Sequence, residues 1–474
     1  IDTDTNDIEA TLILGLAVGA QGRAHEAAPL LDRVARARPG HAHPSRDLGD
    51  LLLRLDRAEE ASVQYRVCLA HAPDDATAHH AMGLALAEMD RIADAIHHFR
   101  QAVHLDPRQA PGWSNLGMML KIEQQFHAAL VAHDNAVARA PTDPQIRVNR
   151  AVALLHTGRL AAAWADYEWR LKLPGHTPLP LDRLLPDIRT LDLTGRTILV
   201  THEEGFGDTL HFLRYVPLLE ARGAHVLIAV PNELRRLLAN QANVLAPEAA
   251  LPQFDFHCPF FSLPRAFGTT METIPGAVPY LHPDPHLVAH WAHRLPPGRM
   301  RVGLVWAGQA RPWLSGFTTL DRRRSAGLEV FAPLTAVPHV HFISLQKGQP
   351  ALQARTLPPG LTLHDPMPEV ADFADTAAII TNLDLVISVD TAVVHLAGAM
   401  GKPVFLLDRY DNCWRWFADR DDSPWYPTLR IFRQERMGEW EPPIRHAATA
   451  LEQHFLNTVI ATTANAVKSN LSPL

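Results

Sequence analysis

Small residues recur along the first third of the chain with a period of 34 residues. Three registers of this period are each held by one residue type: Gly15, Gly49, Gly83 and Gly117; Ala27, Ala61, Ala95, Ala129 and Ala163; and Pro39, Pro73, Pro107 and Pro141. Glycine and alanine let two helices approach closely, and proline ends a helix because it has no N–H group to donate. The pattern therefore predicts a series of helix hairpins, one in each period.

A period of this length, with this order of small residue, alanine and proline, is typical of the tetratricopeptide repeat. About five repeats are predicted between roughly residues 8 and 173, and the last is atypical because Ala151 and Gly175 stand where glycine and proline are expected. Such arrays form concave surfaces that bind peptides or proteins. Asn115 and Asn149 share one repeat position, where they either line such a groove or are ordinary polar residues of a helix.

The rest of the chain alternates short apolar runs with amphipathic stretches. The runs predict strands at 197–201, 225–230 and 254–259, and in a second group at 301–306, 341–346, 361–365, 384–388, 403–407 and 429–433. Continuous apolar strands between helices indicate parallel sheets that are covered on both faces. Two groups of strands predict two Rossmann-like domains that face a cleft, with ligands at the carboxyl ends of the strands.

Composition and charge exclude several classes of function. With a net charge of −7, the chain has no basic surface of the kind that binds nucleic acid. Its three cysteines form no C-x-x-C pair and its 27 histidines are scattered, so we expect no metal site. Neither a run of about 18 apolar residues nor a secretory signal pattern is present, and we expect a cytoplasmic protein without a membrane span. The sequence begins without Met, which leaves open whether a segment precedes it.

The stretch EEGFGDTLHF, residues 203–212, joins a predicted strand to a predicted helix. It departs from the dinucleotide fingerprint G-x-G-x-x-G, because Leu210 stands at the third glycine. Gly205 and Gly207 permit a tight turn with positive φ and leave room for a substrate beside the backbone. Asp208 at the helix start is either a general base for an attacking hydroxyl or an N-cap, and the spacing alone favours the cap.

A second candidate site lies in SVDTAVVHLAGAMGKP, residues 388–403, where a predicted strand ends and a helix begins. Asp390 and Thr391 open this helix, whose free N–H groups suit a diphosphate together with the threonine hydroxyl. His395 follows one turn later on the same side, where it either faces the same ligand or packs as an ordinary helix histidine.

Cations and aromatic residues stand near other strand ends. The run Arg322 to Arg324 either clamps a phosphate or forms a solvated basic turn. Lys347 directly follows a predicted strand. The aromatic stretch WRWFADRDDSPWYP contains Arg415, which stacks with the indole rings on a base or sugar, or packs between domains.

Six motifs, in this order, resemble the glycosyltransferase domain that many bacteria fuse to tetratricopeptide repeats. They are EEGFGDTLHFLRYVPLL, GLVWAG, RRRS, FISLQKG, DFADTAAIITNLDLVISVDTAVVHLAGAMGKPV and WRWFADRDDSPWYP, and they span roughly residues 190–440. That domain is similar to the family 9, heptosyltransferase-like enzymes, and the whole chain has a weaker likeness to the plan of O-GlcNAc transferase. The resemblance implies an α-helical tetratricopeptide solenoid followed by an α/β GT-B fold.

The resemblance also implies roles for single residues. Asp208 matches the aspartate expected to act as general base of an inverting transfer, in an acceptor loop with Glu204, Gly205 and Gly207. The implied donor-binding residues are Arg324, Gln346, Lys347, Asp390, Thr391, Ala392, His395 and Arg415.

Three features depart from the family pattern. Ala392 replaces a glycine, and the loop at 308–325 is longer and more apolar than is usual. Glu204 replaces a frequent glutamine and adds a carboxylate beside Asp208, which makes it a second candidate for the base.

The predicted domains follow from these patterns. They are tetratricopeptide repeats at 1–173, a proline-rich linker or docking segment at 174–195, an acceptor domain at 196–290, a donor domain at 291–440, and a C-terminal helix at 441–474 that packs back on the transferase.

The expected function is an inverting, metal-independent transfer of a sugar from a nucleotide-sugar to a hydroxyl, on a protein that the repeats recruit. The nucleotide-sugar is a co-substrate, and we expect no cofactor. The alternatives are a lipid-linked or polysaccharide acceptor, and a non-catalytic repeat scaffold that binds nucleotide. The donor sugar, its nucleotide and the oligomeric state are left open by the sequence.

Overall fold

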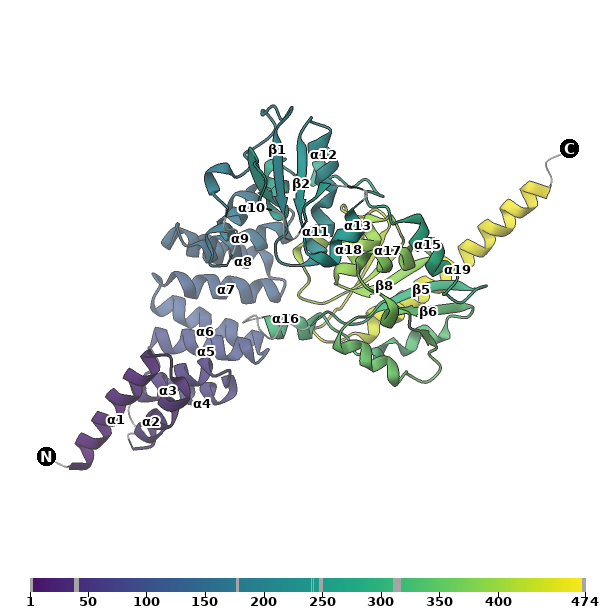
Figure 1. Cartoon of the computed structure of the whole chain (residues 1–474). Coiled ribbons are helices and arrows are strands. Elements are labelled where there is room, and N and C mark those ends of the chain that lie inside the picture. The colour runs from purple at the N-terminus through teal and green to yellow at the C-terminus, as the bar shows by residue number, and fades with distance from the viewer. Residues whose placement is uncertain are drawn as a thin grey trace. The chain divides into compact units, whose positions relative to one another are not determined.

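The structure, a computed structural model, describes residues 3–37, 42–175, 179–239, 241, 243–246, 250–309 and 317–470. The chain divides into two compact units, Ile1–Leu154 and Leu155–Leu474 (Figure 1). Over the described ranges, no helix has both the length and the apolar composition that a membrane crossing needs.

The first unit is built of helix hairpins, which confirms the predicted solenoid. Its helices are α1 (Thr3–Ala20), α2 (Ala24–Ala37), α3 (Ala42–Arg54), α4 (Ala58–His71), α5 (Ala76–Glu88), α6 (Ile92–Leu105), α7 (Ala110–Ile122), α8 (Phe126–Arg139) and most of α9 (Pro144–His156), whose last two residues belong to the second unit. The repeated glycines lie where the helices of a hairpin meet. A Cβ on Gly83 would lie 2.7 Å from the Phe99 ring, and one on Gly117 would lie 2.7 Å from the His133 ring. Pro39 of the proline register lies outside the described residues.

The last predicted repeat is divided between the two units. Its second helix, α10 (Leu160–Tyr167), and the 3-10 turn η1 (Glu168–Lys172) belong to the second unit. The buried Trp164 side chain of α10 donates a hydrogen bond from Nε1 to Thr269 O at 2.8 Å. The first compact unit therefore ends at Leu154 rather than at residue 173, because α10 packs with the elements that follow it.

The segment 174–195, predicted as a linker, packs on the second unit through its later residues. Leu185 and Ile188 are fully buried. The backbone N–H of Leu185 donates to His257 O at 2.8 Å. Residues 176–178 lie outside the described part of this segment.

The second unit contains two parallel sheets, which confirms the predicted α/β architecture. The four-stranded sheet has the order β3-β2-β1-β4, with β1 (Thr197–Thr201), β2 (His225–Ala229), β3 (Asn243–Val244) and β4 (Phe256–Pro259). The six-stranded sheet has the order β10-β9-β8-β5-β6-β7, with β5 (Met300–Val305), β6 (Val340–Ser344), β7 (Leu363–His364), β8 (Leu385–Val389), β9 (Val404–Asp408) and β10 (Leu429–Arg433). The main helices of the unit are α11 (Phe206–Phe212), α12 (Val216–Glu220), α13 (Asn232–Leu238), α14 (Leu263–Ala266), α15 (Pro285–Ala292), α16 (Phe317–Arg323), α17 (Phe373–Thr381), α18 (Ala392–Ala399) and α19 (Glu441–Asn470).

The six-stranded sheet reverses its winding between β5 and β8. The chain passes from β5 to β6 and β7 on one side, and then to β8, β9 and β10 on the other side. Figure 1 shows β5 between β8 and β6. In sheets of this kind, ligands bind outside the carboxyl ends of the strands at such a reversal. The residues that follow β5 and β8 therefore mark the expected binding site.

Two helices, α15 and α19, pack in the part of the second unit that contains the six-stranded sheet. Helix α15 spans the predicted domain boundary at 290 and packs on α17, where Trp291 Nε1 donates to Asp375 Oδ1 at 3.1 Å. Helix α19 packs on the six-stranded half through Ile444 and Leu451, which are fully buried. The structure describes the side chains of α19 only as far as residue 456.

Replacing Gly83 with Ala is expected to destabilise the first unit by about 1–3 kcal/mol, because the fully buried Phe99 ring must move to admit the methyl group. Urea unfolding followed by helical circular dichroism measures the change. The matched control on the same helix is Thr77→Ala at an exposed position, which is expected to stay within about 0.5 kcal/mol. Equal effects of both substitutions would contradict the close packing at Gly83.

Candidate functional site

The loop after β1 and the helix after β8 meet at Gly207. A Cβ at this position would lie 2.8 Å from His395 Cδ2 and 3.3 Å from Ala392 Cα. Only a glycine lets α11 approach α18 this closely, and so the two motifs singled out in the sequence face each other although they are about 190 residues apart. The predicted acceptor loop and the predicted donor turn are thereby brought together.

The tight turn before α11 is made differently from the predicted one. Neither Gly205 nor Gly207 has a positive φ; the left-handed residue is Glu204, with φ 54°. Gly205 is extended and forms the N-cap, and Gly207 is needed for close approach instead. A left-handed backbone at a residue that has a Cβ costs free energy, of order 1 kcal/mol, and such residues cluster at functional sites.

Asp208 is both a capping residue and one half of an ion pair. Its Oδ2 accepts a hydrogen bond from Gly205 N at 3.1 Å, and its Oδ1 pairs with the guanidinium of Arg415. Burial raises the pKa of Asp208 above its ordinary value, and the Arg415 charge opposes this rise. The Arg415 guanidinium also lies over the Trp414 ring, 4.6 Å from its centroid. Arg415, predicted to bind the donor, thus contacts the acceptor loop.

Glu204 is the open carboxylate of this loop. Its residue is exposed, and within the part of the chain that the structure describes its side chain has no hydrogen-bond partner. The pKa of Glu204 is raised to about 6. The larger cause is the loss of hydration of its carboxylate among the surrounding groups, and the second is repulsion from Asp208. Two carboxylates with raised pKa values therefore lie in one loop, and their titrations are linked.

The donor turn after β8 is held by polar and aromatic contacts. Thr391 is the N-cap of α18, and its hydroxyl lies 3.2 Å from Ser388 Oγ. His395 stacks on Trp416 at a centroid distance of 5.2 Å, and its Nδ1 lies 3.0 Å from Tyr426 Oη. Burial lowers the pKa of His395 well below its ordinary value, so the ring is neutral.

Tyr426 is a residue whose role the sequence did not indicate. Its hydroxyl lies between His395 Nδ1 and His211 Nδ1, the latter at 2.9 Å, and so connects α18 to α11. It belongs to the stretch WRWFADRDDSPWYP, but aromatic density alone does not distinguish it from its neighbours. Burial also lowers the pKa of His211 well below the ordinary value.

Three of the remaining predicted donor residues, Gln346, Lys347 and Arg324, contact the protein itself. Gln346 Oε1 accepts hydrogen bonds from Trp306 N at 3.0 Å and Ala307 N at 2.9 Å, which fixes the chain after β5. Lys347 Nζ donates to the Val370 carbonyl. Arg324 Nη2 forms an ion pair with Asp321 Oδ1 at 2.8 Å. Asp390 lies directly before Thr391 at the end of β8.

Of the loop at 308–325, which was predicted to be longer and more apolar than usual, residues 310–316 lie outside the described residues. Of its arginines, Arg323 pairs with Asp411 at 3.0 Å, and Arg324 Nη2 also donates to Gln309 O at 3.0 Å. The arginines of the predicted phosphate clamp are therefore anchored on two carboxylates and a carbonyl group.

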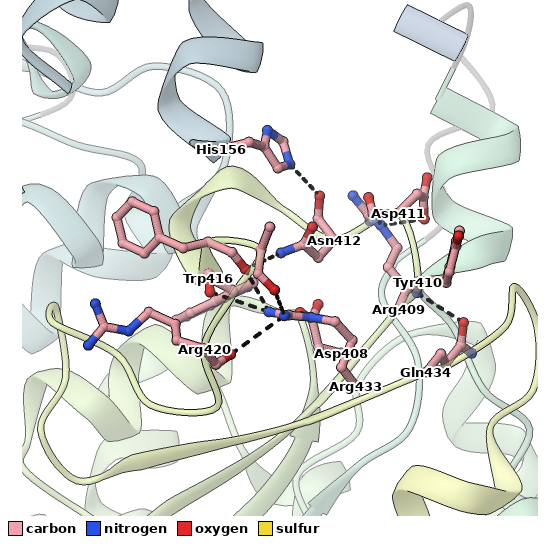
Figure 2. Close-up of polar contacts among 12 residues, drawn as sticks. His156, Asp408, Arg409, Tyr410, Asp411, Asn412, Trp416, Arg420, Arg433 and Gln434 are labelled. Carbon is pink, nitrogen blue, oxygen red and sulfur yellow. Dashed lines mark hydrogen bonds and ion pairs between the residues drawn. The ribbon is translucent and has the colours of Figure 1, made fainter. Parts of the chain in front are cut away.

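The segment 408–417 after β9, which carries Arg415, is held by a half-buried arginine, Arg433 (Figure 2). Arg433 donates to the Phe417 carbonyl at 2.7 Å and to Asp408 Oδ2 at 3.0 Å. Asn412 Nδ2 donates to the same Phe417 carbonyl at 2.7 Å, where φ of Phe417 is 51°. Burial raises the pKa of Asp408 to about 7, with Arg433 opposing the rise. This scaffold was missed by the sequence analysis because its polar partners are far apart along the chain.

The two asparagines of the repeats lie on the first helices of their hairpins. Asn115 Nδ2 lies 2.9 Å from His80 Nε2, and Asn149 Nδ2 donates to Ser114 Oγ at 3.0 Å. Each asparagine thus reaches back to the preceding repeat, and the two side chains contribute to contacts between repeats.

Comparisons with known proteins agree with this architecture. A model of the tetratricopeptide repeat matches residues 20–85, and a model of glycosyltransferase family 9 (heptosyltransferase) matches residues 367–442, which include the turn at 390–395, Arg415 and Tyr426. The matches identify tetratricopeptide repeats in the first unit and part of a glycosyltransferase family 9 domain in the second.

One curated protein and several solved structures are similar to parts of this chain. Protein FlbA of Caulobacter vibrioides is 28% identical, over 90% of this chain and 80% of FlbA. Among solved structures, MamA is 18% identical over 33% of this chain and 92% of its own, with a TM-score of 0.32. The protein TTC0263 of Thermus thermophilus is 23% identical over 37% of this chain and 94% of its own, with a TM-score of 0.31.

Replacing Arg415 with Met is expected to destabilise the second unit by roughly 3 kcal/mol at neutral pH, because the Asp208 carboxylate then lies buried without a cation. The loss shrinks as the pH falls, since protonated Asp208 needs no counter-charge. Chemical denaturation at several pH values measures it.

Two further variants test the ion pair. The double variant Arg415→Met/Asp208→Asn is expected to recover part of the lost stability, and Arg445→Met, which breaks the exposed pair with Glu441, is expected to change it by less than about 1 kcal/mol. A double variant no more stable than Arg415→Met alone would contradict the pairing.

Proposed function

We propose that the second unit is an inverting, metal-independent glycosyltransferase that moves a sugar from a nucleotide-sugar to an acceptor hydroxyl. The observation that carries the proposal is the contact at Gly207, where the carboxylate loop of α11 meets the start of α18. The arrangement supports a reaction in which a base and a bound donor face each other. The family 9 match over residues 367–442 supports glycosyl transfer as the chemistry.

The donor diphosphate would bind at the start of α18, beside the ends of β5 and β8. The first N–H groups of a helix and its partial positive charge attract phosphate, and the Thr391 hydroxyl adds a donor. Lys347 and Arg324 would exchange their present carbonyl and carboxylate partners for the diphosphate. Their charges would then stabilise the leaving group as the glycosidic bond breaks, which is the role that a metal ion has in other transferases.

The proton of the acceptor hydroxyl would pass to the carboxylate pair Glu204–Asp208. In an inverting transfer the acceptor oxygen bonds to the anomeric carbon while the bond to the diphosphate breaks, so the hydroxyl proton has to be taken up by a nearby base. Asp208 is the base that the family resemblance implies, but both of its oxygens have partners, whereas Glu204 is open. We therefore assign the role of general base to the two carboxylates together, as a linked pair.

The repeats would recruit a protein that carries the acceptor hydroxyl. Helical repeat arrays present extended concave surfaces to peptides and proteins, and Asn115 and Asn149 would lie along such a surface. A second candidate function is nucleotide binding without transfer. It is favoured by the ion pair that engages Asp208 and by the protein partners of Arg324 and Lys347.

The donor site is tested by thermal denaturation with nucleoside diphosphates, CMP and their sugars. A matching nucleotide at 100 times its Kd is expected to stabilise the chain by about 2.7 kcal/mol. Thr391→Ala is expected to weaken this shift because it removes a hydroxyl from the cradle. Thr381→Ala, at the far end of α17, is the control and is expected to keep the shift. Nucleotide-dependent shifts that persist unchanged in Thr391→Ala would place the nucleotide elsewhere.

The base is tested by the pH dependence of transfer. Activity is expected to rise with pH through about 6 and then to level off, because the pKa of Glu204 is raised to about 6 and the base has to be deprotonated. Glu204→Gln and Asp208→Asn are each expected to lower kcat by roughly 100- to 10,000-fold. Initial rates with saturating donor give both results, with exposed Glu233→Gln as the control.

The two candidate functions give different outcomes in that assay. A chain that binds nucleotide but turns over no sugar at any pH is a scaffold. Turnover that survives both carboxylate substitutions would remove Glu204 and Asp208 from the reaction.

A further inference from the structure

Residues 155–172, the end of the last repeat, contact both loops of the candidate site. Arg170 reaches the loop after β1 through Glu203. Trp164 and His156 reach the segment 408–417 after β9. All of these residues belong to one compact unit, so the contacts are part of its core.

Arg170 is the most enclosed of these residues, with a side chain that is 2% exposed. Its Nη2 donates to Glu203 Oε2 at 2.8 Å and to Ser262 Oγ at 2.9 Å, and its Nη1 donates to Glu168 Oε1 at 2.9 Å. The guanidinium also lies 5.6 Å from the centroid of the Phe261 ring. A buried arginine with two carboxylate partners holds both in fixed positions, because either partner left alone would be an uncompensated charge.

Glu203 is the residue directly before Glu204, whose backbone is left-handed. When Arg170 anchors the Glu203 side chain, it fixes one end of the strained turn that ends at Asp208. A turn of this kind persists only where its surroundings over-determine it. Arg170 supplies one such constraint from outside the two sheets.

The second loop is held from the same segment. His156 Nε2 donates to Asn412 O at 2.8 Å (Figure 2), and the Trp164 ring meets the Trp414 ring edge-on at a centroid distance of 6.0 Å. Trp414 is next to Arg415, the partner of Asp208. The same piece of the last repeat therefore contacts the loops that supply both halves of the ion pair.

We propose that the end of the last repeat is part of the transferase site, and that Arg170 is a positioning residue that holds the Glu203–Asp208 loop in its reactive shape. This inference rests on the proposed function for its catalytic consequence. Its structural consequence, the order of the loop, is independent of any activity.

Arg170 also contributes to the charge around Glu204. The groups that face Glu204 are Glu203 and Asp208 of its own loop, His202 at the end of β1, Tyr167 and Arg170 of the last repeat, and Arg415 after β9. The Arg170 charge favours ionised Glu204. Removing it raises the pKa of Glu204 and moves the acidic limb of the activity profile to higher pH.

The experiment compares Arg170→Met, Arg170→Lys and Glu203→Gln in the full chain. Amide hydrogen exchange is expected to rise at least roughly tenfold in peptides that cover 203–209 in Arg170→Met, and less in Arg170→Lys, which keeps the charge but not the fork of donors. Arg170→Met is expected to lower kcat/KM by roughly 10- to 100-fold and to shift the acidic limb upward. Glu203→Gln, which leaves Arg170 in place, is expected to raise the exchange of the same peptides.

The control is Arg301→Met, which removes a half-buried arginine at the start of β5 whose partners are the backbone carbonyls of Pro296 and Asn382. It is expected to leave the 203–209 peptides and the pH limb unchanged. Unchanged exchange in folded Arg170→Lys and Glu203→Gln would overturn the inference even if Arg170→Met fails to fold. The inference would also be overturned if Arg170→Met loses activity while the acidic limb of the pH profile and the amide exchange of the 203–209 peptides stay unchanged. Altered exchange in a chain that transfers no sugar would retain the positioning role and reject the proposed function.

Discussion

The partly buried ion pair of Asp208 and Arg415 ties the two sheets of the second unit together. Each charge is withdrawn from water, and neither would remain ionised at low cost without the other. The loop after β1 and the segment after β9 therefore have to meet when the unit folds. Glycine at 207 makes the meeting possible, because a side chain there would separate α11 from α18 before the charges came within reach.

The charged groups around this pair are carboxylates and arginines, and its histidines are neutral. His395 and His211 are both buried and neutral, and aromatic rings occupy much of the remaining space around them. Positive charge comes from arginines, whose pKa values stay high after burial, in place of histidines that would titrate near neutral pH. The electrostatics of the site are therefore set by permanent cations, and the carboxylates are the groups that respond to pH.

The repeat period and the apolar runs were enough to predict the hairpins and the two parallel sheets, because both patterns express local packing that recurs along the chain. The contents of the loops were predictable only in part. Gly207 was expected to bend the chain, yet its role is close approach, and the strained backbone fell on Glu204. Arg415 was recognised as a cation near the site, but its partner lies about 200 residues earlier, and no local pattern records such a pairing. The same is true of Arg170, which the repeat period assigns to a helical array and the contacts assign to the site.

Tyr426 has one hydroxyl proton and two histidine nitrogens, Nδ1 of His211 and Nδ1 of His395, within hydrogen-bond distance. Because both rings are neutral, the hydroxyl donates to one nitrogen and accepts from the other. The two histidines are therefore obliged to be opposite tautomers, and the chain of hydrogen bonds between α11 and α18 has a direction. Reversing that direction moves the protons of three side chains together. A ligand that requires His395 Nε2 to donate rather than accept would thus also select the tautomer of His211.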